Sequence, residues 1–98
     1  EKEANRFVQY ITRAVEENRQ YALHLPSDIE TKITFRLLPN GQIENLRVTK
    51  GSGYAAYDES SLMGVKKAAP FTMPKEPDLI KRLATEITLE FKNEYEAV

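Results

Sequence analysis

The sequence contains no cysteine and no tryptophan, and its one histidine is His24. Without cysteine, the chain cannot form a disulfide, use a thiol as a nucleophile or hold zinc through thiolate ligands. No stretch approaches the ~20 consecutive apolar residues that a membrane-spanning helix needs, and no signal peptide is evident. Because the chain begins with Glu1 and not with methionine, we expect it to be a piece of a longer protein.

The charge of the chain is nearly balanced, with 14 lysines and arginines against 15 acidic residues and a formal net charge of -1. Such a chain has no strong field to draw it onto nucleic acid or an anionic membrane. Its composition, 41% hydrophobic and 30% charged, is typical of a globular protein. A length of 98 residues suits one domain, so we expect residues 1–98 to form a single globular unit.

Three helices are predicted. Residues 1–19 form an amphipathic pattern in which apolar residues recur at four-residue spacing, at Phe7, Ile11 and Val15. Asn18 is a plausible end of this helix. The second helix is expected over residues 57–69. Its apolar stripe is Leu62, Val65 and Ala69, with Tyr57 or Ser61 one turn earlier.

The starts of the second and third helices carry local signals. Asp58 can either cap the second helix or complement its dipole. The third helix is short and covers residues 77–83, with Pro77 in the first turn, where proline is tolerated.

Residues 29–50 are predicted to form a β-hairpin. From Ile29 to Leu37 apolar and polar residues alternate, as in a strand with one buried and one solvated face. Pro39-Asn40-Gly41 then supplies the Asn-Gly pair that is typical of a hairpin turn. In the second strand the alternation breaks, which predicts a β-bulge near Glu44–Asn45.

A third strand is predicted over residues 85–92, where Ile87, Leu89 and Phe91 alternate with polar residues. If the second helix returns the chain along the sheet, this strand pairs antiparallel with the first strand. The expected fold is therefore α+β, a three-stranded antiparallel sheet of order 2-1-3 with two main helices packed on one face. The opposite face, with Lys32, Arg36 and Glu90, should be solvated.

This topology leaves the second and third strands at the two edges of the sheet, and either edge could bind a partner. The third strand lacks both proline and an obvious bulge. An open edge of this kind can accept a peptide as an added strand. The candidate partner-binding residues are those of the strand itself: Thr85, Glu86, Ile87, Thr88, Leu89, Glu90, Phe91 and Lys92. Two alternatives stay open, namely that the charges only keep the edge soluble and that the edge pairs with a second copy.

We find no pattern that predicts catalysis, a cofactor or a metal site. His24 has no second histidine or cysteine with which to share a metal ion. Ser60-Ser61 lies within a predicted helix and not on a nucleophile elbow, and Asp58-Glu59 is better explained as negative charge at a helix start. Gly51-Ser52-Gly53 lacks the spacing of a phosphate-binding loop. We therefore expect a binding module and not an enzyme.

Several segments, in their order along the chain, resemble the TonB/TolA C-terminal domain family. The hairpin from Leu38 to Val48 is similar to the family's P-D-G-x-V-x-x-V-x-V segment, and Thr49 to Gly53 is similar to its x-x-S-S-G loop. Tyr57-Asp58 with the following helix, and the proline-containing stretch from Ala69 to Pro74, resemble two further motifs. The TolA branch matches better, because Pro74 to Leu79 looks like its P-P-x-P-x-L segment.

The resemblance implies a periplasmic domain of an inner-membrane-anchored protein that couples ion-motive force to outer-membrane partners. For a TolA-like domain, in the Tol-Pal system that maintains envelope integrity, the implied partners are TolB and Pal, with colicins and filamentous phage coat proteins exploiting the same domain. For a TonB-like domain they are the TonB-box peptides of outer-membrane transporters that take up siderophores and other nutrients. Neither reading involves nucleic acid or a cofactor.

Overall fold

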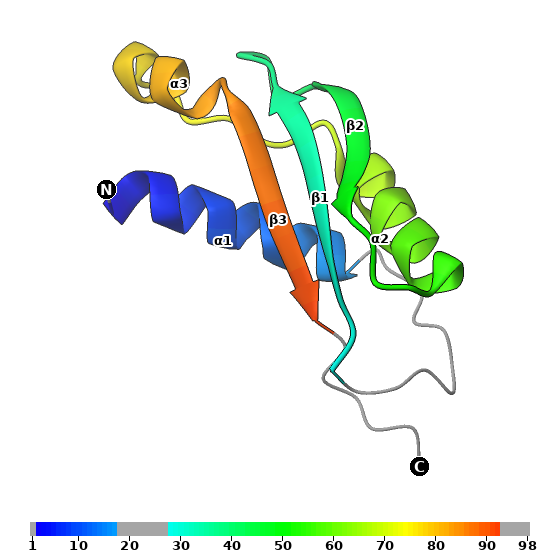
Figure 1. Ribbon diagram of the computed structural model, residues 1–98. Helices are drawn as coiled ribbons and strands as arrows, with labels where there is room; N and C mark the ends of the chain where they lie inside the picture. Colours follow the sequence, from blue (N-terminus) through cyan, green and yellow to red (C-terminus); the bar gives the residue numbers. More distant parts are fainter. Residues whose placement is uncertain (1, 18–27, 93–98) are drawn as a thin grey trace.

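The computed structural model describes residues 2–17 and 28–92 (Figure 1). In chain order its elements are α1 (Lys2–Glu17), β1 (Glu30–Leu37), β2 (Ile43–Lys50), α2 (Ala55–Ala68), α3 (Pro77–Leu83) and β3 (Glu86–Lys92). The predicted end of the first helix at Asn18, and His24, lie outside the described residues.

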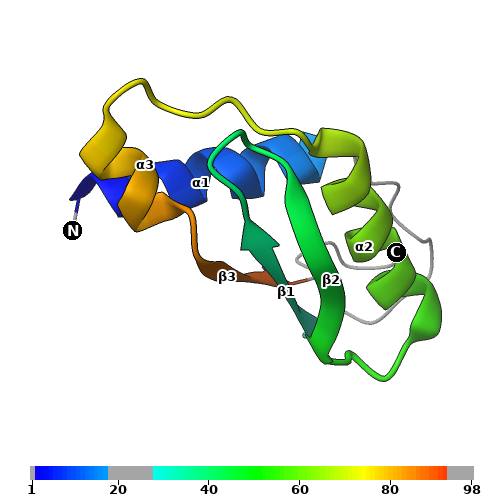
Figure 2. The same cartoon turned by 90° about the horizontal axis from the view of Figure 1, so that it is seen from above.

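The three strands form one sheet of order β2-β1-β3, and β1 pairs antiparallel with both neighbours. This confirms the predicted 2-1-3 order. The chain leaves β2 through α2, crosses the molecule and returns through α3 into β3 (Figure 1). Figure 2 shows α1 and α2 on the same side of the sheet. The prediction that both main helices cover one face is therefore also correct.

The core lies between the sheet and these helices. Alternate residues of β1 and β3 are buried there because successive side chains of a strand point to opposite faces. They are Thr31, Ile33, Phe35 and Leu37 of β1, and Ile87, Leu89 and Phe91 of β3. The helices contribute Ile11, Val15, Tyr57, Val65 and Leu83. Burying one such large aliphatic or aromatic side chain stabilises the fold by about 1.5–3 kcal/mol.

The second helix begins two residues before the predicted start at Tyr57 and ends one residue before Ala69. Tyr54 occupies the N-cap position without a capping side-chain bond, so Asp58 lies in the first turn. There its carboxylate accepts the backbone N–H of Ser52 at 3.0 Å. The two predicted roles were to cap the helix and to complement its dipole. Asp58 has the second role, because its negative charge lies near the positive end of the helix dipole. The buried stripe is Tyr57, Ser61, Gly64 and Val65.

The hairpin turn is held against the segment that links α2 to α3. Gly41 has a φ of 90°, and its N–H donates to the Leu38 carbonyl at 2.9 Å. Its own carbonyl accepts the Phe71 N–H at 2.8 Å. The Phe71 ring stacks on Phe35, with the ring centroids 6.2 Å apart. The turn, the linking segment and the sheet are thereby joined at one end of the core.

The bulge predicted near Glu44–Asn45 is present in β2. Thr34 pairs with Arg47 but Arg36 pairs with Glu44, so two residues of β2 oppose one residue of β1. Asn45 has a φ of 56°, a value that asparagine tolerates better than most residues. A second irregularity, which the sequence did not indicate, occurs between Lys32 and Ile33. These neighbours in β1 pair with Lys50 and Val48, so one step along β1 corresponds to two steps along β2.

Candidate partner-binding edge

The two edges of the sheet differ in regularity. β2 has two register shifts against β1, whereas β3 pairs with β1 without interruption from Lys92 opposite Glu30 to Glu86 opposite Arg36. Bulges disturb the row of main-chain groups that an added strand needs, and they are a common means of blunting an edge. Among the strands that the structure describes, β3 therefore has the more regular free edge (Figure 1).

The register of β3 determines which of its main-chain groups face outward. The Leu37 N–H donates to the Thr85 carbonyl at 2.9 Å, and these residues lie in line with the β1–β3 pairs. In an antiparallel ladder, residues that exchange hydrogen bonds alternate with residues whose N–H and C=O point away. Every second residue after Thr85 therefore directs its main-chain groups toward β1. These residues are Ile87, Leu89 and Phe91.

The intervening residues of β3 direct their N–H and C=O groups away from β1. We call these outward groups, which belong to Glu86, Thr88, Glu90 and Lys92, the β3 edge. A hydrogen bond between β1 and β2 supports this assignment. The Lys32 carbonyl, which should face β2, accepts the hydroxyl of Thr49 from β2 at 3.2 Å.

The eight residues that the sequence singled out divide into two groups. Thr85 precedes the strand, and its N–H donates to the Leu83 carbonyl at 2.8 Å. Ile87, Leu89 and Phe91 bury their side chains in the core. These four hold the strand in place, and the residues of the β3 edge offer the groups to which another chain could bond. Sequence alternation separates the two sets of side chains but does not assign the direction of the main-chain groups.

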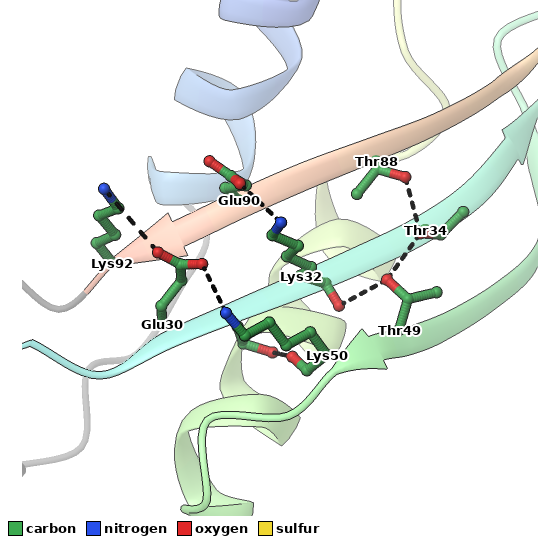
Figure 3. A network of polar contacts seen from close by, with 9 residues as sticks. Glu30, Lys32, Thr34, Thr49, Lys50, Thr88, Glu90 and Lys92 are labelled. Carbon is green, nitrogen blue, oxygen red and sulfur yellow. Dashed lines mark hydrogen bonds and ion pairs between the residues drawn. The ribbon is translucent and has the colours of Figure 1, made fainter.

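A network of polar side chains covers the solvated face of the sheet, which we call the outer face (Figure 3). At its centre Thr34 is only 4% exposed. Its hydroxyl oxygen lies 2.9 Å from those of Thr49 in β2 and Thr88 in β3. The hydroxyl ladder thus spans all three strands and ends at the β3 edge.

Ion pairs surround this ladder. The Lys32 ammonium lies 3.1 Å from one oxygen of Glu90, and the Arg47 guanidinium lies 3.1 Å from one oxygen of Glu86. The glutamate side chains are 54% and 56% exposed. Exposed pairs of this kind contribute about 0–1 kcal/mol each to stability. Their main effect at the edge is to place two carboxylates beside the outward main-chain groups.

Two hollows lie near the edge. One has a volume of about 250 Å³ and is lined by Val8 of α1, Leu83, Ile87 and neighbouring residues of β3. We call it the edge hollow. The other, of about 300 Å³, lies between α1 and α3 against Phe7, Tyr10, Pro74 and Leu79, and shares Leu83 with the first. The second hollow is lined largely by apolar side chains, with Arg6 at its margin. The edge hollow combines the apolar side chains of Val8, Leu83 and Ile87 with polar residues, namely Arg82, Thr85, Glu86 and Thr88.

The residues weighed as possible catalysts have structural roles. Ser61 is buried and its hydroxyl donates to the Tyr57 carbonyl at 3.0 Å. The Asp58 carboxylate accepts a hydrogen bond from the Ser52 N–H. Across residues 2–17 and 28–92, no group of three or more histidine, aspartate or glutamate residues could hold a metal ion. No helix in the same residues is long and apolar enough to cross a bilayer.

Comparison with solved structures shows the same fold in two proteins. A TolA domain III, determined by NMR with a peptide from the N-terminus of TolB, superimposes with a TM-score of 0.75 at 19% identity, covering 93% of this chain and 75% of that one. A Helicobacter pylori TonB C-terminal domain (its residues 179–285) gives a TM-score of 0.72 at 18% identity, covering 94% and 83%. A shorter form of that domain gives 0.66 at 18% identity, covering 88% and 90%.

No curated protein sequence matches the chain. The family described as TonB C terminal, in contrast, matches residues 4–91. This range includes all the helices and strands except the first two residues of α1 and the last residue of β3. The resemblance found in the hairpin, loop and linking segments is therefore confirmed over nearly the whole length. This chain belongs to the family of TonB C-terminal domains.

Proposed function

We propose that this domain works in the periplasm as the terminal binding module of a TolA-like protein of the Tol-Pal system. In this role it binds an extended segment of an outer-membrane-side partner by strand addition at the β3 edge. The rest of the protein, anchored in the inner membrane, transmits ion-motive force through that contact and so maintains envelope integrity. The proposed partners are TolB and Pal, with colicins and filamentous phage coat proteins as ligands that exploit the same edge.

The observation that carries this proposal is the regular, outward-facing row of main-chain groups on β3, whereas β2 at the opposite edge of the sheet has two register shifts. Main-chain hydrogen bonds of this kind give affinity, and alternate side chains give specificity. The similarity to a TolA domain III that binds a TolB peptide supports a partner of this class.

A TonB-like role is the second candidate. The family that matches the chain is described as TonB C terminal, and a TonB domain has nearly the same TM-score as the TolA domain. In that role the same edge would bind the TonB box of an outer-membrane transporter and energise the uptake of siderophores or other nutrients. Both roles require an extended peptide on β3 and differ in the identity of that peptide.

An NMR titration of the ¹⁵N-labelled domain tests both roles. One peptide comes from the N-terminus of a TolB protein and the other is a TonB box. We expect the peptide of the true partner to shift the amides of Thr88 and Glu90 most, because their N–H groups face outward. Since the peptide must become ordered on binding, we expect modest affinity. Failure of both peptides to shift any β3 amide would contradict strand addition.

A proline variant provides the matched control. Glu90→Pro removes one outward N–H, and proline is tolerated in an edge strand where that group faces solvent. The variant should keep its fold and lose most of its peptide affinity. Glu90→Ala loses the same carboxylate but keeps the N–H, so it should bind within a few-fold of the parent. Equal binding by both variants would show that the peptide lies elsewhere.

A further inference from the structure

We infer that the β3 edge selects an extended segment whose residues alternate between apolar and basic, the apolar ones facing the helices and the basic ones facing the outer side of the sheet. This inference rests on the proposed strand addition at β3 and specifies the chemistry of the segment that binds there. It follows from three features of the edge: the direction of its main-chain groups, the edge hollow and the two carboxylates of the outer face.

The direction of the main-chain groups fixes which face each residue of the added strand would have. In a sheet, residues opposite one another on neighbouring strands place their side chains on the same face. Residues opposite Glu86, Thr88 and Glu90 would therefore lie on the outer face. Those between them would point to the helix side, and this holds whether the added strand is parallel or antiparallel.

On the helix side, the residue nearest Ile87 would meet the edge hollow. This hollow includes residues from both faces of β3, because Ile87 lines it together with Glu86 and Thr88. Val8 of α1 and Leu83 of α3 supply further apolar surface, and Arg82 and Thr85 complete the lining. The hollow therefore lies at the free margin of the strand and not beneath the sheet. Its volume of about 250 Å³ is several times the ~30 Å³ that one water molecule takes in the liquid, so it can accept a leucine-sized side chain.

On the outer side, the added strand would meet Glu86 and Glu90 with Thr88 between them. One oxygen of each carboxylate already forms an ion pair within the sheet. Glu86 pairs with Arg47 of β2, and Glu90 pairs with Lys32 of β1. A carboxylate accepts hydrogen bonds at two oxygens, so a lysine or arginine of the added strand could complete the row of alternating charge. An acidic residue in the same place would face like charge directly opposite, which is unfavourable.

Four synthetic peptides test this inference by NMR titration and calorimetry. The first alternates lysine and leucine, the second glutamate and leucine, and the third lysine and alanine. The fourth has the composition of the first but groups its lysines and leucines in blocks. We expect the first to bind at β3 roughly tenfold more tightly than the second, from two cross-strand charge pairs. It should exceed the third by at least about tenfold, through the leucine in the hollow, and it should also exceed the fourth.

A matched pair of variants assigns the charge preference to its residues. The double variant Glu86→Gln with Glu90→Gln should bind the lysine and glutamate peptides with nearly equal affinity. Glu44→Gln removes an outer-face carboxylate of the same 56% exposure from the opposite edge strand, and should leave the preference unchanged.

The outcomes separate this inference from the proposed function. If all four peptides shift the Thr88 and Glu90 amides with equal affinity, strand addition stands and the selectivity is wrong. A charge preference that survives in the double variant also overturns the inference, as does equal binding of the leucine and alanine peptides. If none of the four peptides shifts these amides but a natural partner peptide does, the inferred selectivity is also wrong. If nothing binds at β3, both proposals fall together.

Discussion

At the scale of the residue, Gly41 shows how one position joins parts of the chain that are far apart in sequence. The Asn-Gly pair predicts a turn, and the positive φ of Gly41 explains the glycine locally. The structure adds a second requirement, because a Cβ at this position would collide with the carbonyl oxygen of Phe71. Phe71 in turn stacks on Phe35 in the core. The turn glycine therefore also determines where the segment after α2 crosses the sheet.

Gly41→Ala should accordingly destabilise the domain by at least about 3 kcal/mol, since the left-handed backbone alone costs about 1–2 kcal/mol and the collision adds to it. Gly53→Ala is the control, because Gly53 has a similar φ of 89° with no heavy atom within 4 Å of the added Cβ. It should cost about 1–2 kcal/mol. Urea unfolding measures both. Similar losses in the two variants would mean that Phe71 moves aside at little cost.

Thr34 shows what a sequence pattern cannot convey about a residue. Alternation places it on the outer face, and its hydroxyl contacts with Thr49 and Thr88 show that this placement is correct. Yet Thr34 is 4% exposed, since Thr49 and Thr88 contact it from the adjacent strands. Burial on a solvated face depends on which residues lie opposite, and that is a property of the register between strands. The difference between a position on a solvated face and actual exposure to solvent is largest in the central strand, because it has a neighbouring strand on each side.

At the scale of the element, the two edge strands show what the sequence predicts well and what it does not. The irregular spacing of apolar residues in β2 correctly predicts the bulge at Asn45. The second shift, opposite Lys32 and Ile33, has no such signal because Val48 is the last apolar residue of β2, and no apolar residue follows it in the strand to show a change in spacing. The helix start at Ala55 was missed for a similar reason: Ala55 and Ala56 are exposed and add nothing to an apolar stripe.

Hydrogen exchange of the free domain tests the β3 edge at this scale. The amides of Ile87 and Leu89 face β1 and should exchange slowly, through opening of the sheet. The amides of Thr88 and Glu90 face away and should exchange much faster, so that protection alternates along the strand. The fast amides should become protected when a peptide binds. Uniformly slow exchange along β3 without peptide would mean that another segment already covers the edge.

At the scale of the whole molecule, one core unites all the elements. Buried residues from α1, β1, α2, the linking segment, α3 and β3 belong to a single cluster, and partly buried residues of β2 pack against it. Periodicity predicted the buried sides of β1 and β3, and the rules for connections then restricted the topology to the observed order. In α2 the predicted apolar stripe is only partly correct, because Val65 is buried whereas Leu62 and Ala69 are half-buried. The hollows beside β3 could not be predicted, because they arise where α1, α3 and β3 meet and depend on the angle at which those elements pack.

A single core predicts that a substitution in α1 weakens the whole domain and not that helix alone. Ile11 is fully buried, and Ile11→Ala should cost about 2–5 kcal/mol, a large part of the ~5–15 kcal/mol typical of a folded domain. Gln9→Ala, on the exposed side of α1, should change stability by about 0.5 kcal/mol or less. Urea unfolding followed by helix circular dichroism and by β3 amide signals should give one coincident transition in both variants. If α1 in Ile11→Ala melts before β3, the helix is not part of the cooperative core, and the proposed transmission of force from α1 to a partner at β3 would fail.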